Sequence, residues 1–233
     1  MPQGRLHFRD ELRELERQAL GGLDLVTEAL ERTLEALERQ DLELAGMVVA
    51  DDDRIDGRYM EVHQGVLSLI ARQSPVATDL RLIAALLDVI KHVERMGDQC
   101  VNIAKLIPLA GSPPPDDAGM LQRILEMGRQ AGLLVEQARE AFARRDVGLA
   151  EDLVLKDDEI DRLNRESFPL ALRFADDPAG LEWAMRMVQV ARWLERIGDH
   201  AVDIGEQTAF VATGLFREFT DASHPELAPG GPG

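Results

Sequence analysis

The sequence predicts an all-α protein made of two tandem three-helix bundles that are related by an internal repeat. Composition is the first reason: leucine, alanine, glutamate and arginine dominate the 233 residues, aromatic residues make up 4%, and tyrosine occurs once. Helix-forming residues are therefore abundant, while the aromatic residues that favour sheets are scarce. The second reason is a duplication of sequence segments, and the third is a heptad spacing of apolar positions.

The duplication divides the chain into two copies of one unit. Residues 41–56 (DLELAGMVVADDDRID) match residues 146–161 (DVGLAEDLVLKDDEID) at eight of sixteen positions. Residues 93–104 (VERMGDQCVNIA) match residues 194–205 (LERIGDHAVDIG) at six of twelve positions. The offset is 105 residues in the first pair and 101 in the second, so the length difference falls in a loop between the segments, where a repeat tolerates it.

Each copy is expected to contain three helices. Turn residues and apolar spacing place them at residues 6–39, 42–72 and 77–107 in the first copy, and at 118–144, 147–175 and 179–216 in the second.

Proline sets the expected boundaries between the parts of the chain. The segment 108–115 (PLAGSPPP) is rich in proline, so we expect it not to be helical. This gives a first bundle at 1–110, a linker at 111–117 and a second bundle at 118–220. The remaining residues, 221–233, are rich in proline and glycine and are expected to be a disordered tail.

The third helix of each copy has the clearest heptad pattern. Its apolar positions alternate in steps of four and three residues, which is typical of a buried seam in a helical bundle. Short connections make neighbouring helices antiparallel, so each copy should close as a three-helix bundle. Cys100 lies on the seam and is expected to be inert core, whereas Trp193 lies beside it and is a candidate for an interface between bundles or subunits. The seam positions are Leu82, Leu86, Val89, Val93, Met96, Cys100 and Ile103, then Trp183, Met187, Val190, Leu194, Ile197, Ala201 and Ile204.

Acidic side chains accompany each seam at a spacing of four residues. They are Asp52, Asp56, Glu94, Asp98 and the polar Asn102 in the first copy, and Asp157, Asp161, Glu195, Asp199 and Asp203 in the second. A spacing of four keeps each series on one face of its helix. Like charges at that spacing repel, and placing them beside an apolar seam is costly unless positive charge lies among them.

Two sources of that positive charge are open. One is arginine, because Arg95, Arg196, Arg54 and Arg81 are near in sequence. The other is a cation that takes oxygen ligands, such as Fe, Mn, Mg, Ca or Zn. Gly97 and Gly198 lie inside the acidic faces, where they indicate close approach of a backbone, an ion or a partner. His92 and His200 lie near the acidic faces, and we expect a structural or solvent-facing role for them rather than metal ligation.

Composition also excludes several function classes. The formal net charge of −17 argues against a nucleic-acid partner and against adsorption to an anionic membrane. A single cysteine excludes an internal disulfide and a thiolate metal cluster. The sequence has no run of 18 apolar residues and no apolar signal segment at its beginning, so we expect a cytoplasmic protein without membrane insertion.

The third-helix motifs resemble a known family. Glu-Arg-(Met/Ile)-Gly-Asp followed by Val-x-Ile occurs once per half, at Glu94 and at Glu195, and Pro75-x-Ala77-x-Asp79-Leu80-Arg81 precedes the first copy. This combination resembles the PhoU family of phosphate-signalling regulators, and the resemblance covers about residues 6–216. Two departures are visible: Asp203 stands where an asparagine is expected, and the second half lacks the full Pro-x-Ala-x-Asp-Leu-Arg turn.

The resemblance implies a function. PhoU-like proteins are non-enzymatic cytoplasmic regulators, often dimers, that act with the ATPase subunit of an ABC phosphate transporter and with a membrane sensor histidine kinase. They repress the phosphate-starvation response when phosphate is plentiful. Some members carry iron or zinc clusters, or bind manganese or magnesium, on their Glu-x-x-x-Asp faces. Carried over by position, the candidate ligands are Glu94, Asp98 and Asn102 with Glu195, Asp199 and Asp203.

Three other functions are alternatives to this one. A helical adaptor without metal would use the acidic faces to dock basic partners, and its stability would not respond to EDTA. A carboxylate-bridged metal enzyme would need Glu-x-x-His pairs, which the five histidines do not form, and nucleotide-binding and hydrolase motifs are absent from the sequence. A direct phosphate sensor is disfavoured by the net charge unless a metal bridges the anion.

Overall fold

Seven α-helices and one short 3₁₀ turn form the described part of the chain. The computed structural model describes residues 2–72, 75–111, 113–114, 117 and 119–219, and within that part it contains no strand. The helices are α1 (Pro2–Arg39), α2 (Leu42–Ala50), α3 (Asp52–Arg72), α4 (Ala77–Ala110), α5 (Met120–Arg144), α6 (Val147–Ala171) and α7 (Pro178–Thr213), with the turn η1 (Leu172–Phe174) before α7. The expected tail at 221–233 lies outside the described residues.

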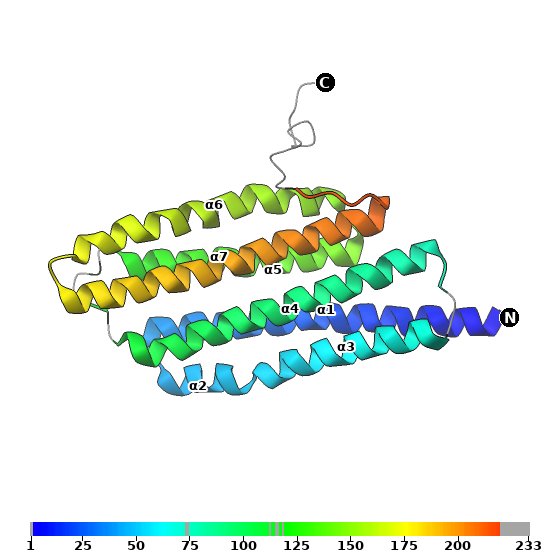
Figure 1. Ribbon diagram of the computed structural model, residues 1–233, viewed down its shortest axis with the longest axis horizontal. Helices are drawn as coiled ribbons and strands as arrows, with labels where there is room; N and C mark the ends of the chain where they lie inside the picture. The colour runs from blue at the N-terminus through cyan, green and yellow to red at the C-terminus, as the bar shows by residue number, and fades with distance from the viewer. Residues whose placement is uncertain (1, 73–74, 112, 115–116, 118, 220–233) are drawn as a thin grey trace, which may run out of the picture.

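The helices form two bundles that lie side by side (Figure 1). Helices α1 to α4 make the first bundle and α5 to α7 the second, which confirms the predicted fold class. The bundles meet where α4 packs on α7 and α1 packs on α5. Helices α4 and α7 run in opposite directions at this boundary (Figure 1), so the third helices of the two copies are in direct contact.

Aspartate side chains set the starts of three helices. Asp41 accepts hydrogen bonds from the backbone N–H of Glu43 (3.1 Å) and of Leu44 (2.9 Å) before α2. Asp146 accepts from Leu149 N–H (3.1 Å) before α6, and Asp177 accepts from Ala179 N–H (3.2 Å) before α7. Each carboxylate satisfies a backbone donor that the helix leaves free. The aligned caps Asp41 and Asp146 begin the second helix of each copy at equivalent positions.

The expected helix at 42–72 is wrong as a single element, because it divides at Asp51. The Asp51 N–H still bonds to the Met47 carbonyl (2.9 Å), and its carboxylate accepts from Arg32 Nη1 of α1 (2.6 Å). This tertiary ion pair stabilises the interruption, and it is invisible in the local sequence. The second copy lacks this division, although there α6 gives way to the turn η1 before residue 175.

Two helix ends also differ from expectation. Helix α4 continues through Pro108 to Ala110, so the expectation that residues 108–110 are not helical is wrong. Proline lacks only the N–H that would reach Ala104, and near a helix end this removes one bond without stopping the helix. Helix α7 ends at Thr213 rather than 216, because Gly214 takes a φ of 79° and closes the helix as a left-handed cap.

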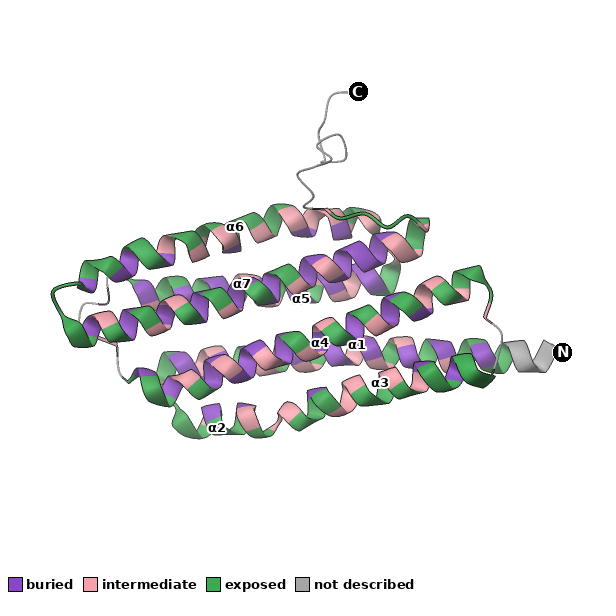
Figure 2. Cartoon of the chain, viewed as in Figure 1, coloured by how far each residue is buried: buried purple, intermediate pink, exposed green. Residues whose placement is uncertain are grey.

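One apolar core runs through both bundles. Of the fourteen seam positions on α4 and α7, all are buried except Leu82, which is half-buried. Figure 2 shows buried residues on the facing sides of the helices and exposed residues on the outer surface. Cys100 is in this core, and burial raises the pKa of its thiol to about 12, so the thiol is inert as expected. Trp193 packs against the core and stays partly exposed.

No helix in the described part of the chain combines the length and the hydropathy that spanning a bilayer requires.

Candidate functional site

Four carboxylates of the second bundle gather between α6 and α7. Asp157 and Asp161 project from α6, and Glu195 and Asp199 project from α7, each pair one helical turn apart. Burial, and after it the charges of Asp199, Asp161 and Glu195, raise the pKa of Asp157 to about 7. The pKa values of Glu195 and Asp199 are raised for the same reasons, burial first. The four groups therefore share one partly dry space.

Two oxygens in this cluster have no hydrogen-bond partner within the described residues. They are Asp157 Oδ1 and Glu195 Oε2, and both are buried. The other Glu195 oxygen is satisfied, because it accepts from Arg192 and from Asn164 Nδ2 (3.4 Å). Buried polar atoms are nearly always bonded, so two unpartnered carboxylate oxygens in one cluster require a cation, a proton or water. This donor set fits a metal that prefers oxygen ligands.

Gly198 allows Asp157 to lie directly against α7. A Cβ at position 198 would come within 3.0 Å of Asp157 Oδ1, which real Cβ atoms do not do. The expectation of a backbone, an ion or a partner close to this glycine differs from the structure, where a side chain lies there. The approaching group is the Asp157 carboxylate itself, so the glycine makes room for a candidate metal ligand.

The carboxylates of the first bundle form a similar but more open cluster. Asp52 and Asp56 of α3 face Glu94 and Asp98 of α4. The pKa of Asp52 is raised by burial and then by Asp56 and Asp98, and the pKa of Glu94 is raised by burial and then by Asp98. Here arginine supplies part of the positive charge, because Arg95 lies 3.3 Å from Glu94 and 3.6 Å from Asp98. A Cβ at Gly97, the counterpart of Gly198, would lie 3.0 Å from Ile55 and 3.5 Å from Asp52 Oδ1.

The remaining arginines named from the sequence have other positions. Arg54 pairs with Glu28 (3.6 Å), and the Arg81 guanidinium packs against Gly214 at the end of α7. Arg196 lowers the pKa of Glu195 only at longer range, whereas Arg192 bonds to Glu195 directly. Arg192 is not among the arginines that the sequence pointed to as sources of positive charge. The spacing of three residues between Arg192 and Glu195 on one helix is the signal that could have identified it.

Two candidate ligands do not join the clusters. Asn102 is half-buried on α4, and among the described residues no hydrogen bond connects it to the carboxylates. Asp203 turns toward the boundary with α4, where its Oδ2 lies 3.4 Å from Nδ1 of both His92 and His200. The two imidazoles also face each other, with their Nδ1 atoms 3.2 Å apart. The expectation of a structural or solvent-facing role did not anticipate this contact between residues 108 positions apart.

Ligand spacing differs between these groups. In the described part of the chain, three donor atoms lie within 4.8 Å of one another at His92, His200 and Asp203, and the oxygens of the two carboxylate clusters are spread more widely. Like charges repel one another, which accounts for the wider spacing of the carboxylate oxygens.

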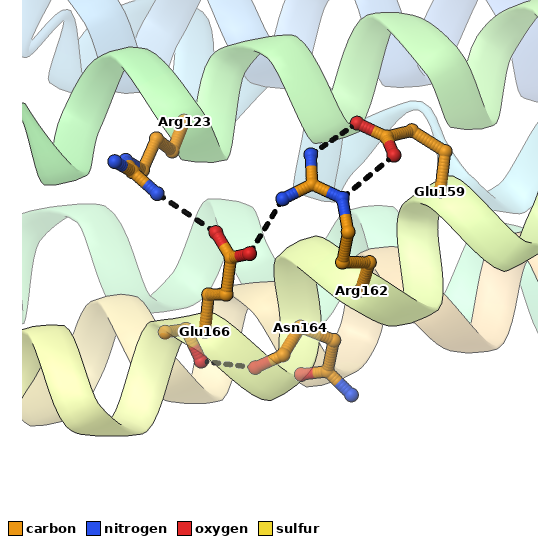
Figure 3. Close-up of polar contacts among 6 residues, drawn as sticks. Arg123, Glu159, Arg162, Asn164 and Glu166 are labelled. Atoms are coloured by element: carbon orange, nitrogen blue, oxygen red, sulfur yellow. Dashed lines mark hydrogen bonds and ion pairs between the residues drawn. The ribbon is translucent and has the colours of Figure 1, made fainter.

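Acidic residues on the outer face of α6 have ordinary partners (Figure 3). Glu159 bonds to Arg162 through both carboxylate oxygens (2.8 and 2.5 Å), and Glu166 bonds to Arg162 (2.5 Å) and to Arg123 of α5 (2.9 Å). Asn164 lies on the same helix and donates to Glu195, which reaches into the cluster. Glu159 and Glu166 are therefore neutralised by arginine, while the inner acid Asp157 is not.

Comparison with known proteins agrees with this architecture. The PhoU domain model matches residues 23–107 and 124–208, one match in each bundle. A curated relative from Clostridium acetobutylicum, a "Phosphate-specific transport system accessory protein PhoU homolog", is 30% identical over 92% of this chain and 98% of its own length. "Phosphate-specific transport system accessory protein PhoU homolog 1" from Thermotoga maritima is 33% identical over 92% of this chain and 93% of its own length. The crystal structure of PhoU from Pseudomonas aeruginosa superposes with a TM-score of 0.81 at 28% identity, covering 89% of this chain and all of that one. On the duplicated motif, the duplicated bundle and these matches, the chain belongs to the PhoU family.

Proposed function

We propose that this protein is a regulatory accessory protein of phosphate uptake. It acts in the cytoplasm, contacts the ATPase subunit of an ABC phosphate transporter and a sensor histidine kinase, and represses the phosphate-starvation response when phosphate is plentiful. The observation that carries the proposal is the match of both bundles to the PhoU domain, together with full-length relatives named as accessory proteins of phosphate-specific transport. The role is non-catalytic: the helical surface passes on the state of the transporter by binding its partners differently in each state.

Metal binding is the second part of the proposal. Asp157, Asp161, Glu195 and Asp199 would hold a cation between α6 and α7, with iron or zinc as the first candidates and manganese or magnesium next. Two buried oxygens without hydrogen-bond partners and a glycine that admits Asp157 support this assignment. The bound cation would supply positive charge, and the carboxylates would then cross-link two helices instead of repelling each other.

A deletion strain tests the regulatory role. Loss of the gene should make phosphate-scavenging genes constitutive, and the wild-type gene should restore repression in high phosphate. Normal repression without the protein would overturn the proposal. A pull-down in high and in low phosphate identifies the partners, and sedimentation equilibrium decides whether the protein is a homodimer, as we propose.

Metal content tests the cation separately from the regulatory role. Protein purified without chelator should carry metal, and Glu94→Ala combined with Glu195→Ala should lower the content. Glu159→Ala is a matched control, because Glu159 is exposed on α6 and paired with Arg162. Substoichiometric metal that the double variant leaves unchanged contradicts metal binding at these faces.

An adaptor without metal is the second candidate. It is supported by Arg95 beside Glu94 and by Arg192 beside Glu195, because arginine already offsets part of the negative charge. The two candidates differ in one measurement, the melting temperature of the protein after EDTA treatment and after addition of a divalent ion. A metal protein responds to both treatments, and the adaptor responds to neither.

A further inference from the structure

The boundary between the two bundles contains a second group of candidate ligands, separate from the two carboxylate clusters. His92 lies near the middle of α4, and His200 and Asp203 lie on α7, which runs beside α4 in the opposite direction (Figure 1). The imidazole rings are tilted by 51° with centroids 5.2 Å apart. The side chains of His92 and His200 are 18% and 22% exposed, so most of the pair is shielded from solvent.

The three donor atoms form a nearly equilateral triangle. The Nδ1 atoms are 3.2 Å apart, and Asp203 Oδ2 is 3.4 Å from each of them. A tetrahedral Zn²⁺ with bonds of about 2.0–2.1 Å has ligand-to-ligand edges of roughly 3.3–3.4 Å. The three atoms therefore already have the spacing of one face of a zinc coordination tetrahedron.

Hydrogen bonding explains this triangle less well than a metal does. A single proton shared by the two Nδ1 atoms makes one hydrogen bond between the imidazoles. It leaves Asp203 with two contacts that are long for a hydrogen bond. Protons on both Nδ1 atoms would place two donors against each other. A cation at the centre satisfies all three atoms at once, and neutral imidazole nitrogen is a preferred ligand of zinc and its neighbours in the transition series.

The surroundings also favour a cation. The charge of Asp88 raises the pKa of His92, and the charge of His200 lowers the pKa values of Asp199 and Glu94. Acidic groups from both helices therefore lie near the triangle. Lys91 is the opposing charge near His92. A locally negative potential raises the concentration of divalent ions at such a site.

The internal repeat does not account for these residues. At the offset of 101 residues that relates the third helices, His92 corresponds to Trp193, His200 to Gln99 and Asp203 to Asn102. The pseudo-symmetric position thus has no imidazole and no carboxylate. The triangle therefore occurs on one side of the α4–α7 contact only. It is not a by-product of the internal duplication, because the other copy lacks all three residues.

We propose that His92, His200 and Asp203 bind one divalent transition-metal ion of the zinc type, which cross-links the two bundles. The fourth coordination position is open to water or to an external ligand, since Asp203 is partly exposed. The ion joins α4 to α7 between residues 108 positions apart, so its removal loosens the contact between the bundles while leaving each bundle intact.

A zinc competition titration of the full-length, chelator-treated protein tests this site. His92→Gln and His200→Gln should each lower the affinity of the protein for one zinc ion at least about tenfold. Each should also abolish the zinc-induced rise in melting temperature. His63→Gln is the matched control, because His63 lies on α3 beside Tyr59 and away from the boundary. A zinc affinity that neither boundary variant changes, or an absence of zinc binding, overturns the proposal.

Two further measurements separate the site from the carboxylate clusters and from a folding defect. The double variant Asp157→Asn/Glu195→Gln should keep the tetrahedral Co²⁺ absorption of the histidine site, and its loss there would count against the proposal. In the wild-type protein, zinc should shift the Nδ1 nitrogen resonances of His92 and His200 to metal-bound values. Unchanged Nδ1 resonances at saturating zinc would overturn the assignment without any variant.

Discussion

At the scale of single residues, Asp157 carries the largest electrostatic cost in the described part of the chain that no partner offsets. Its Oδ1 is buried against Gly198 and has no hydrogen bond, and four acidic side chains raise its pKa. Its counterpart Asp52 lies in a more exposed cluster that Arg95 partly neutralises. Residues that lower stability in the free protein are often kept for a ligand, and Asp157 fits that description.

The pH dependence of stability should expose this cost. The pKa of Asp157 is about 7 in the folded protein and about 3.9 in an unfolded chain, so the folded state binds its proton more tightly. The contribution of this group to stability is therefore complete below about pH 4 and is lost as pH rises toward 7. In metal-free protein, Asp157→Asn should raise the free energy of unfolding by roughly 2 kcal/mol at pH 8, a value discounted for partial exposure, and by little near pH 4.

Urea unfolding of the wild type and the variant at the two pH values measures this difference. Asp176→Asn is the control, since Asp176 is exposed, is not among the charges that act on Asp157, and a surface substitution changes stability by about 0.5 kcal/mol or less. An equal effect of Asp157→Asn at both pH values would show that the carboxylate is not strained by burial.

Gly198 provides a second prediction at this scale. In Gly198→Ala the new Cβ displaces Asp157 Oδ1, while alanine favours the helix by about 1 kcal/mol. We expect a folded protein whose metal affinity at the second cluster falls about tenfold or more. Gly57→Ala is the control, because a Cβ at position 57 meets no atom within 4 Å and should leave metal affinity unchanged. Isothermal titration calorimetry with the metal measures both affinities. An unchanged affinity in Gly198→Ala would contradict the role of this glycine.

At the scale of elements, the division between α2 and α3 makes the two carboxylate clusters unequal. Asp52 is the first residue of α3, where free backbone N–H groups favour a negative charge, whereas Asp157 lies in the middle of α6. Arginine acts on both clusters, through Arg95 in the first and through Arg192 and Arg165 in the second. The helix start therefore makes the difference: negative charge costs less in the first cluster, and a cation gains less by binding there.

This asymmetry predicts an order of affinity. The second cluster should bind a metal about tenfold more tightly than the first, so Asp157→Asn/Glu195→Gln should remove the tighter of the two carboxylate sites. Asp52→Asn/Glu94→Gln should remove the weaker one. A titration of both double variants with the same metal compares them directly, and the reverse order would mean that the helix start at Asp52 does not control affinity.

At the scale of the whole molecule, sequence patterns predicted the fold well and the contacts between the bundles poorly. Heptad spacing identified the seams of α4 and α7, because burial along one helix face is a local property of the sequence. The break at Asp51 depends on Arg32 of α1, and the meeting of His92 with His200 depends on how two bundles pack. Such contacts join distant residues, and no local spacing encodes them.

The candidate site follows the same division. The pairing of α6 carboxylates with those of α7 was predictable, since both series keep a spacing of four residues on adjacent helices. Which arginine neutralises which acid was not predictable where the two lie on different helices, as Arg54 with Glu28 and Arg32 with Asp51 show. Arginine side chains are long, and in such pairs tertiary packing sets the partner.

The shared core leads to a prediction about folding. Because α4 packs on α7 and the apolar cluster includes residues of both bundles, the repeats should unfold together in spite of the linker between them. Both tryptophans, Trp183 and Trp193, lie on α7, so their fluorescence reports on the second bundle, while far-ultraviolet circular dichroism reports on both. The two signals should follow one urea transition.

Destabilising one bundle extends this test. Leu86→Ala in α4 creates a cavity in the first bundle and should lower stability by about 2–5 kcal/mol. If the bundles are coupled, the tryptophan transition of the second bundle moves to lower urea by the same amount as the circular dichroism transition. If they are independent, the tryptophan signal stays where it was, and the second bundle survives the loss of the first. The first outcome is expected, because the packing of α4 on α7 leaves neither bundle with a complete core of its own.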